Sequence, residues 1–295
     1  MHCQMLSKIG IGTANFTQNY GILPSDDAID VNSILKLATD HGIDTFDTAF
    51  AYGDFLSILD DKSDLSNLNV ITKFSILDDY DAIFQKMKHV KEQYSFDGYY
   101  GLLIHDPQNL ERADKGELLS LFDKLHNGGL VKKIGISVYD LNDLEGFRNI
   151  IDPELIQIPL SPLSQTFVND KFIDYVERQE IEVHARSLFL QGVLLSDKLP
   201  ESLNNLEPLW RLYMGIFEQH SEMYMDATKS YNLRLEALLS WAFTHQWVSK
   251  WILGVSCKQD LEEIIESNNQ EISHPFSSLK YMAHPMTDPR NWKMA

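Results

Sequence analysis

Short apolar segments alternate along the whole chain with longer segments of helical periodicity, and this alternation constrains the fold more than any other feature. Strands that alternate with helices form a parallel sheet, because each helix returns the chain to the same end of the sheet. Eight such units predict an α/β protein of the (β/α)₈ or TIM-barrel type. The eight segments predicted as strands are residues 8–14, 43–47, 70–74, 99–105, 133–138, 155–158, 182–187 and 251–255.

Four of the intervening segments carry apolar residues three or four positions apart and are predicted as helices, at residues 28–41, 80–94, 115–127 and 232–245. Gly42 and Gly128 are expected to end the first and third of these helices. Residues 191–208 are expected to form a long loop after the seventh strand, a candidate substrate lid, and residues 275–295 form a tail. No linker divides the chain, so residues 1–295 are expected to be one barrel domain.

The charge balance disfavours two classes of partner, and the small-molecule partner that we expect follows from the site described below. The chain has 25 basic and 43 acidic residues, which gives a net charge of −18 and disfavours nucleic acid and anionic membranes as partners. Cys3 and Cys257 suggest neither a disulfide framework nor a zinc site, and we expect no metal ion. With no leader-like start and no apolar stretch approaching about 20 residues, a cytoplasmic monomer or dimer is expected.

Polar residues follow successive predicted strands, at the end of a barrel where active sites form. They are Asp47, Tyr52, Lys73 and His105. Reduction of a carbonyl group by hydride needs an acid beside the carbonyl oxygen, and a tyrosine becomes acidic enough when an ammonium group stabilises its phenolate. A carboxylate keeps that ammonium group charged and in place. Each of the four residues alone has a simpler structural explanation, and it is their combination that indicates a site.

The segments GIDTFDTAFAYG, VITKF and LLIHDP, which contain these residues, resemble the segments that hold the catalytic Asp, Tyr, Lys and His of the aldo-keto reductases. The resemblance implies that Tyr52 donates the proton, Lys73 lowers its pKa, Asp47 holds Lys73 and His105 orients the carbonyl oxygen. It also implies a (β/α)₈ barrel and a nicotinamide-dependent oxidoreductase that acts on an aldehyde, a ketone or a sugar.

The resemblance extends from GIGTANF near Gly10 to LGVSCKQDLEE near Leu253. It implies NADPH as cofactor, with NADH as the alternative, and VHARSLFLQGVLL resembles a bacterial subgroup often associated with surface-polysaccharide or nucleotide-sugar pathways. The chain departs from the family pattern at Ser161 and Ile264, where the family usually has asparagine. The cofactor-binding residues implied by the resemblance are Ser137, Gln157, Ser187, Gly254, Ser256 and Lys258.

Several other features of the sequence have alternative interpretations. Gly10 and Gly12 suggest a Rossmann fingerprint, but Asn15 occupies the position of its third glycine. The tryptophans near the C-terminal end are interpreted as core, and the acidic residues between 54 and 64 as a solvated face. Alternative functions are a cofactor-binding regulatory subunit with little turnover, a sugar-modifying enzyme with a retained cofactor, and a scaffold without cofactor.

Overall fold

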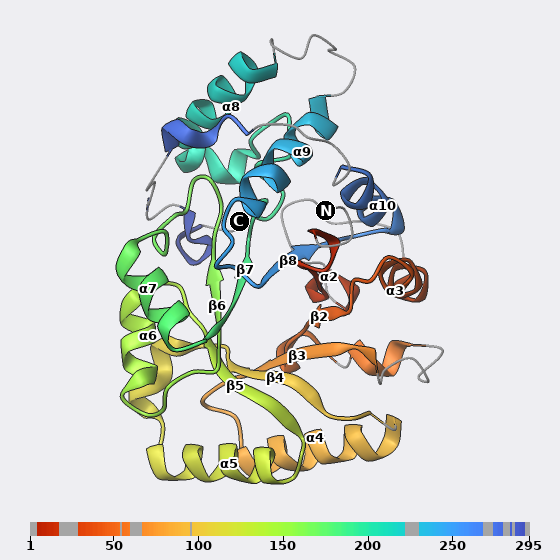
Figure 1. Cartoon of the computed structure of the whole chain (residues 1–295), viewed down its shortest axis with the longest axis vertical. Helices are drawn as coiled ribbons and strands as arrows, with labels where there is room; N and C mark the ends of the chain where they lie inside the picture. Colours follow the sequence, from red (N-terminus) through yellow and green to blue (C-terminus); the bar gives the residue numbers. More distant parts are fainter. Residues whose placement is uncertain are drawn as a thin grey trace.

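Eight parallel strands close into a barrel in the computed structural model of the chain (Figure 1). The structure describes residues 5–17, 29–53, 55–59, 67–94, 96–221, 230–267, 274–279, 284 and 287–292. Each strand pairs with the next in sequence, and β8 closes the barrel against β1. The strands are β1 (Ile9–Gly12), β2 (Thr45–Asp47), β3 (Asn69–Phe74), β4 (Tyr99–Ile104), β5 (Val131–Ser137), β6 (Leu155–Pro159), β7 (Glu182–Arg186) and β8 (Lys250–Gly254).

The (β/α)₈ prediction is confirmed, and each of the eight predicted segments overlaps a strand. The agreement has a physical reason, because strands of a parallel barrel are buried on both faces and therefore appear in sequence as short, nearly continuous apolar runs. The boundaries differ by a few residues. The predicted 8–14 segment pairs only over β1, since the chain turns into the short helix α2 (Ala14–Thr17) directly after Thr13.

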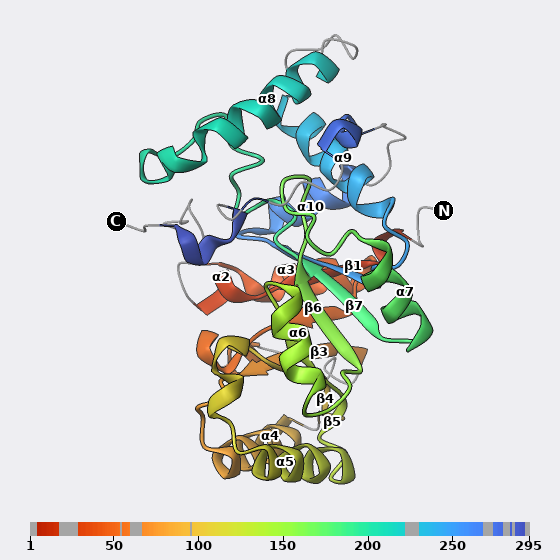
Figure 2. The ribbon, with the colours of Figure 1, turned by 90° about the vertical axis from the view of Figure 1, so that its left-hand side faces the viewer.

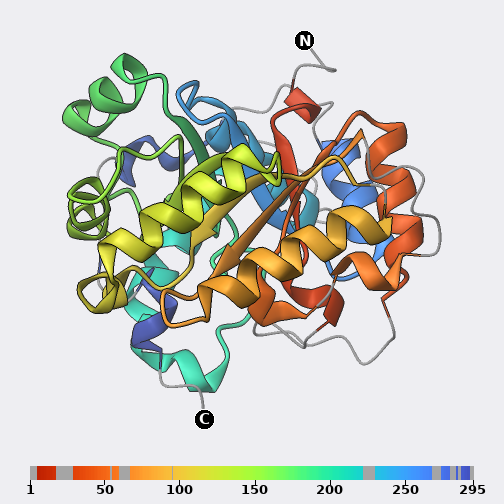
Figure 3. The ribbon, with the colours of Figure 1, turned by 90° about the horizontal axis from the view of Figure 1, so that it is seen from below.

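Helices cover the outside of the barrel. The structure has α3 (Val31–Asp40), α4 (Tyr80–Tyr94), α5 (Lys115–Asn127), α6 (Leu141–Arg148), α7 (Asp170–Arg178), α8 (Glu207–Ser221), α9 (Ser230–Phe243) and α10 (Lys258–Ser267). Helices α4 and α5 lie side by side across the sheet (Figure 3). The four predicted helices are all present, and residue 28, where the first was expected to begin, lies outside the described residues.

Local sequence determines where the helices begin and end. Asp114 caps α5 by accepting hydrogen bonds from the backbone amides of Gly116 and Glu117. Gly42 follows α3 with a φ of 75°, in the left-handed region that favours glycine. Helix α5 ends at Asn127 with Gly128 as its C-cap, as predicted. Gly128 keeps right-handed helical geometry, and it is Gly129 that has a positive φ of 60°.

The prediction of a loop over residues 191–208 is wrong in its second half. The turn η5 (Glu201–Leu206) is followed directly by α8, which stands with α9 above the barrel (Figure 2). Tyr213 and Phe217 of α8, four residues apart on one helical face, are both buried, and the Tyr213 hydroxyl donates to the Leu194 carbonyl oxygen at 2.9 Å. This packing stabilises α8, which overlaps the predicted loop only at residues 207 and 208 and otherwise lies in a segment that the sequence left unassigned.

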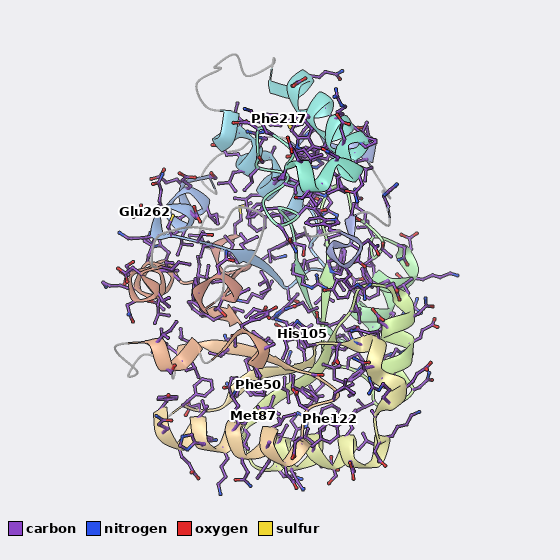
Figure 4. All side chains as sticks on the ribbon, turned by 180° about the vertical axis from the view of Figure 1, so that it is seen from behind. Phe50, Met87, His105, Phe122, Phe217 and Glu262 are labelled. Carbon is purple, nitrogen blue, oxygen red and sulfur yellow. The ribbon has the colours of Figure 1, made fainter. Side chains whose placement is uncertain are left out.

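The core has two parts. A large apolar layer lies between the strands and the helices, where Met87 of α4 and Phe122 of α5 are buried against the sheet (Figure 4). A second, small cluster fills the barrel interior and consists of Ile71, Leu103 and Leu155.

A polar layer closes the amino-terminal end of the barrel. The Glu182 carboxylate accepts hydrogen bonds from the Tyr100 hydroxyl and the Lys133 ammonium group, both at 2.5 Å, and lies 2.7 Å from Nε2 of His184. Burial opposes ionisation of Glu182, but the bonds from His184, Lys133 and Tyr100 outweigh it and lower the pKa of Glu182 to about 2. The layer therefore holds a fixed negative charge among its partners, at the barrel end opposite to the strand carboxyl ends.

The remaining structural expectations have mixed outcomes. Trp241 and Trp251 are buried in the core as predicted, and Trp247 packs against it. Cys257 is exposed and free, whereas Cys3 and the aspartates between residues 54 and 64 lie outside the described residues. Within the described ranges, no helix has the length and apolar character needed to cross a membrane.

Candidate active site

The four predicted catalytic residues lie at the carboxyl ends of three neighbouring strands. Asp47 is the last residue of β2, and Tyr52 ends the turn η1 (Phe50–Tyr52) that follows it. Lys73 immediately precedes Phe74, the last residue of β3. His105 comes directly after β4 and lies near the middle of the molecule (Figure 4). Parallel pairing in register brings these chain-distant residues to one edge of the barrel.

Asp47 and Lys73 form a buried ion pair. The Lys73 ammonium group lies 2.5 Å from Oδ2 of Asp47 and donates to the Thr48 carbonyl oxygen at 3.0 Å. The other carboxylate oxygen, Oδ1, accepts a hydrogen bond of 2.7 Å from Nε2 of Gln157. Asp47 is 6% exposed and Lys73 is 2% exposed, so both charges are removed from water and depend on each other.

Tyr52 lies beside both Lys73 and His105. The Lys73 ammonium nitrogen is 5.6 Å from the centre of the Tyr52 ring, and the Tyr52 and His105 rings meet edge to face with their centres 5.7 Å apart. Burial, and next the charge of Asp47, raise the pKa of the Tyr52 phenol above its usual value. Tyr52 is therefore protonated at neutral pH, and a lowering of its pKa by Lys73 stays a prediction.

His105 is neutral at physiological pH. Burial, and next the positive charge of Lys73, lower the pKa of the His105 imidazole to about 4. A neutral imidazole has one nitrogen that donates a hydrogen bond and one that accepts. At this position it can donate to a carbonyl oxygen without adding a second positive charge beside Lys73.

A cavity of about 600 Å³ opens at this edge of the barrel. Its wall contains Asp47, Tyr52, Lys73 and His105 together with five of the six predicted cofactor-binding residues, which are Ser137, Gln157, Ser187, Gly254 and Ser256. Ser137 and Gln157 are register partners on β5 and β6, and the Ser137 hydroxyl lies 3.4 Å from Oε1 of Gln157.

The sixth residue, Lys258, lies outside the cavity wall. It is the first residue of α10, and its ammonium group pairs with Glu262 at 3.0 Å on the half-exposed surface of that helix. The two departures from the family pattern differ in position. Ile264 lines the cavity, whereas Ser161 is fully buried behind the wall with a hydroxyl that has no hydrogen-bond partner among the described residues.

A dinucleotide cofactor fits the residues present. The cavity volume is within the range of ligand sites in proteins, about 300–1,000 Å³. An added Cβ at Gly254 would meet no atom within 4 Å, so the cavity is open beside this glycine. Oδ1 of Asn15 is buried without a hydrogen-bond partner among the described residues, while its amide nitrogen donates to Ser256 at 3.0 Å. Such an acceptor calls for a donor on a bound molecule.

The segment after β7 contributes to the cavity wall, and its role as a substrate lid stays a prediction. Gln191, Leu195 and Ser196 line the cavity. Arg234 of α9, which is 1% exposed, donates to the Ser196 carbonyl oxygen at 3.1 Å and forms an ion pair with Asp197. Ser187, at the start of this segment, has a positive φ of 65°, a backbone conformation that is uncommon for residues other than glycine and is concentrated at functional sites.

Sequence reasoning gave no role to two residues of the cavity wall, Arg186 and Tyr139. The guanidinium carbon of Arg186 lies 4.2 Å from the centre of the Tyr139 ring. The signal in the sequence was an arginine one position before the end of the seventh predicted strand, immediately before Ser187. A charged residue at a strand carboxyl end points to the active-site end of a barrel.

The chain is similar to known proteins in sequence and in fold. The family model described as the aldo/keto reductase family matches residues 8–277. Solved structures with similar folds include an aldo-keto reductase of Bacillus halodurans in its holo form, with a TM-score of 0.64 and 15% identity over 94% of this chain and 93% of that one. An aldo/keto reductase of Brucella melitensis gives a TM-score of 0.60 and 18% identity over 93% and 94% of the two chains.

A third structure, an aldo-keto reductase from a Medee basin deep-sea metagenome library, gives a TM-score of 0.62 and 18% identity over 94% of this chain and 92% of that one. At these identities the structures show a shared fold. A comparison with curated proteins finds no match.

Proposed function

The chain belongs to the aldo/keto reductase family, and from this premise we propose that it reduces the carbonyl group of a small molecule with Tyr52 as the proton donor. It is an NAD(P)H-dependent oxidoreductase. When bound, the nicotinamide supplies the hydride for the carbonyl carbon. The proton for the carbonyl oxygen comes from the Tyr52 hydroxyl.

The observation that carries this proposal is the buried Lys73–Asp47 pair beside the Tyr52 ring in one cavity wall. Tyr52 is protonated before the reaction, so the acid is present in its active form at neutral pH. As the proton leaves, negative charge develops on the phenol oxygen, and the ammonium group of Lys73 stabilises that charge. Asp47 holds Lys73 in position.

His105 orients the substrate in this proposal. With a pKa of about 4, its imidazole stays neutral across the physiological range because burial and Lys73 disfavour the charged form. It donates a hydrogen bond to the carbonyl oxygen, which fixes the oxygen near the Tyr52 hydroxyl.

We propose NADPH as the preferred cofactor, with NADH as the alternative. Gln157 and Ser137 would hold the nicotinamide amide, and Ser187 would lie at the pyrophosphate. Gly254, Ser256 and Lys258 would meet the adenosine end. Lys258 would have to exchange Glu262 for a 2′-phosphate, and this exchange costs little because exposed ion pairs contribute about 0–1 kcal/mol.

The physiological substrate is proposed to be a keto-sugar of surface-polysaccharide or nucleotide-sugar metabolism, acted on in the cytoplasm. The support is the likeness of VHARSLFLQGVLL to a subgroup with that association. We further propose that residues 1–295 are one domain, since the strands of the barrel run from residue 9 to residue 254 and all eight belong to one closed sheet.

The test is the variant Tyr52→Phe, assayed by NADPH consumption with 4-nitrobenzaldehyde and with a panel of nucleotide-linked keto-sugars. Loss of the acid should lower kcat about 10²- to 10⁴-fold, while NADPH binding, followed by its fluorescence, should be unchanged. Tyr80→Phe is the matched control, because the Tyr80 hydroxyl only donates to the Ile76 carbonyl oxygen outside the cavity.

The other outcomes separate the alternatives. Equal activity of Tyr52→Phe and the wild type would refute the assignment of the acid. Binding of NADPH without turnover of any substrate would favour a regulatory subunit. Tight cofactor that co-purifies and is not exchanged would favour a sugar-modifying enzyme that retains it, and no binding of NADPH or NADH would leave a scaffold.

A further inference from the structure

Arg186 brings a positive charge into the cavity that the proposed proton transfer does not use. It is the last residue of β7 and lines the cavity wall. Its guanidinium group donates to the Val138 carbonyl oxygen at 3.3 Å and to the Ser187 hydroxyl at 3.4 Å. A guanidinium group has five N–H donors. The described residues thus provide acceptors for only part of its donor capacity, and none of those acceptors is a carboxylate.

The other charged groups in the described cavity wall have partners. Lys73 is paired with Asp47. Asp260, at the start of α10, accepts hydrogen bonds from the backbone amides of Ser256 and Cys257. Arg186 differs from Lys73, because its guanidinium group has only neutral acceptors and no ion pair among the residues that the structure describes. In a chain with a net charge of −18, a local cation of this kind is needed if an anion is to enter the site.

Tyr139 holds the guanidinium group in a defined place. Its ring contacts Arg186 at 4.2 Å and also Arg290 at 3.7 Å. The two arginines differ in one respect. Arg290 forms an ion pair with Asp288 at 2.6 Å, whereas Arg186 has only neutral acceptors. A guanidinium group stacked on an aromatic ring keeps its edge N–H groups available, and this fork binds carboxylate or phosphate oxygens.

Arg186 also lies close to the reacting groups. Burial is the main influence on the pKa values of Tyr52 and His105, and the charge of Arg186 is a smaller influence that lowers both. An anion bound by Arg186 would therefore lie near the groups that the carbonyl oxygen of the substrate meets. The pyrophosphate of the cofactor is the other source of an anion, because Ser187 is the next residue.

We propose that Arg186 binds an anionic group of the substrate, a carboxylate or a phosphate, and so makes the enzyme selective for acidic carbonyl compounds over neutral ones. This inference rests on the proposed function, since it names the substrate class of the same site. It makes Arg186 a specificity-determining residue, and it assigns Tyr139 to positioning the guanidinium group.

The experiment compares 4-formylbenzoate with its neutral methyl ester, which has the same aldehyde. Wild-type enzyme should reduce the acid with the higher kcat/KM. Arg186→Met should lower the ratio of kcat/KM for the acid to kcat/KM for the ester about 10- to 100-fold, the effect expected when a charge-assisted hydrogen bond to the acid alone is lost. Arg186→Lys should recover part of the loss. Arg290→Met is the matched control and should keep the wild-type ratio of acid to ester, because Asp288 already neutralises Arg290.

Two further measurements separate the explanations. If Arg186→Met weakens NADPH binding and leaves the ratio of acid to ester unchanged, the arginine serves the cofactor phosphates and the proposal is overturned. If the wild type reduces neither compound, calorimetric titration with 4-formylbenzoate and with the ester decides. If the wild type binds the acid more tightly than the ester, and Arg186→Met removes this difference, the anion site is supported although the proposed function has failed. If the wild type binds both compounds equally, the anion site is overturned as well.

Discussion

Removing the ammonium group from the buried Lys73–Asp47 pair should destabilise the protein far more than an average substitution. In Lys73→Met the methionine occupies a similar volume, so the packing of β3 is retained. The Asp47 carboxylate, 6% exposed, would keep the hydrogen bond from Gln157 at 2.7 Å and lose the partner at 2.5 Å that balances its charge.

The expected cost follows from that burial. Breaking a buried ion pair by removing one partner costs about 3 to 5 kcal/mol, because an uncompensated charge remains in a medium of low polarity. For a chain of this length, about 2 °C of melting temperature corresponds to 1 kcal/mol. Lys73→Met should therefore melt about 6 to 10 °C below the wild type.

The assay is urea unfolding of four proteins, the wild type, Lys73→Met, Asp47→Asn and the double variant. Both single variants leave one buried charge, whereas the double variant leaves none and should recover to within about 2 kcal/mol of the wild type. A Lys73→Met protein within 1 kcal/mol of the wild type, or a double variant as unstable as the sum of the two single variants, would refute the reasoning. All variants that lack Lys73 should be inactive, whatever their stability.

Two further predictions concern stability. The folded-state pKa of His105, about 4 because of burial and Lys73, lies below the reference value of about 6.5, so its contribution of about 3 kcal/mol is complete above pH 6.5 and is lost as the pH falls towards 4. Urea unfolding of the wild type and of His105→Gln at pH 4.5 and pH 7 measures this contribution. If the free energy of unfolding of the two proteins depends on pH in the same way, the prediction is contradicted. Gly135→Ala should cost about 3 kcal/mol or more, or prevent folding, because its Cβ would lie 1.7 Å from the Leu155 carbonyl oxygen. Gly215→Ala in α8, with open space around the new Cβ, is its control and should be neutral or slightly stabilising.

The barrel and the positions of Asp47, Tyr52, Lys73 and His105 could be predicted from the sequence because both depend on regular features. Strands buried on both faces leave continuous apolar runs, and the register of parallel strands carries their carboxyl ends to one edge. Residues that follow such strands are therefore brought together whatever the loops between them do. The order of polar residues along the chain was sufficient for these four.

Features that depend on packing between distant segments could not be predicted. Helix α8 forms because Tyr213 and Phe217 find a core to pack against, and local sequence does not reveal that core. Lys258 forms an ion pair with Glu262 outside the cavity wall. The spacing of residues in the sequence does not predict which partner a lysine binds. The proposed role of Arg186 depends on the absence of a carboxylate partner among the described residues, which is a property of the assembled site and not of any segment.

The polar layer around Glu182 lies at one end of the barrel and the cavity at the other. Strand pairing and this layer thus stabilise the barrel independently of Arg186 and Tyr139, the residues proposed to determine substrate specificity. Descendants of a duplicated gene can change Arg186 or Tyr139 and acquire a different substrate preference while keeping the same barrel. In such a lineage, new specificities would arise through few substitutions and without compensating changes elsewhere.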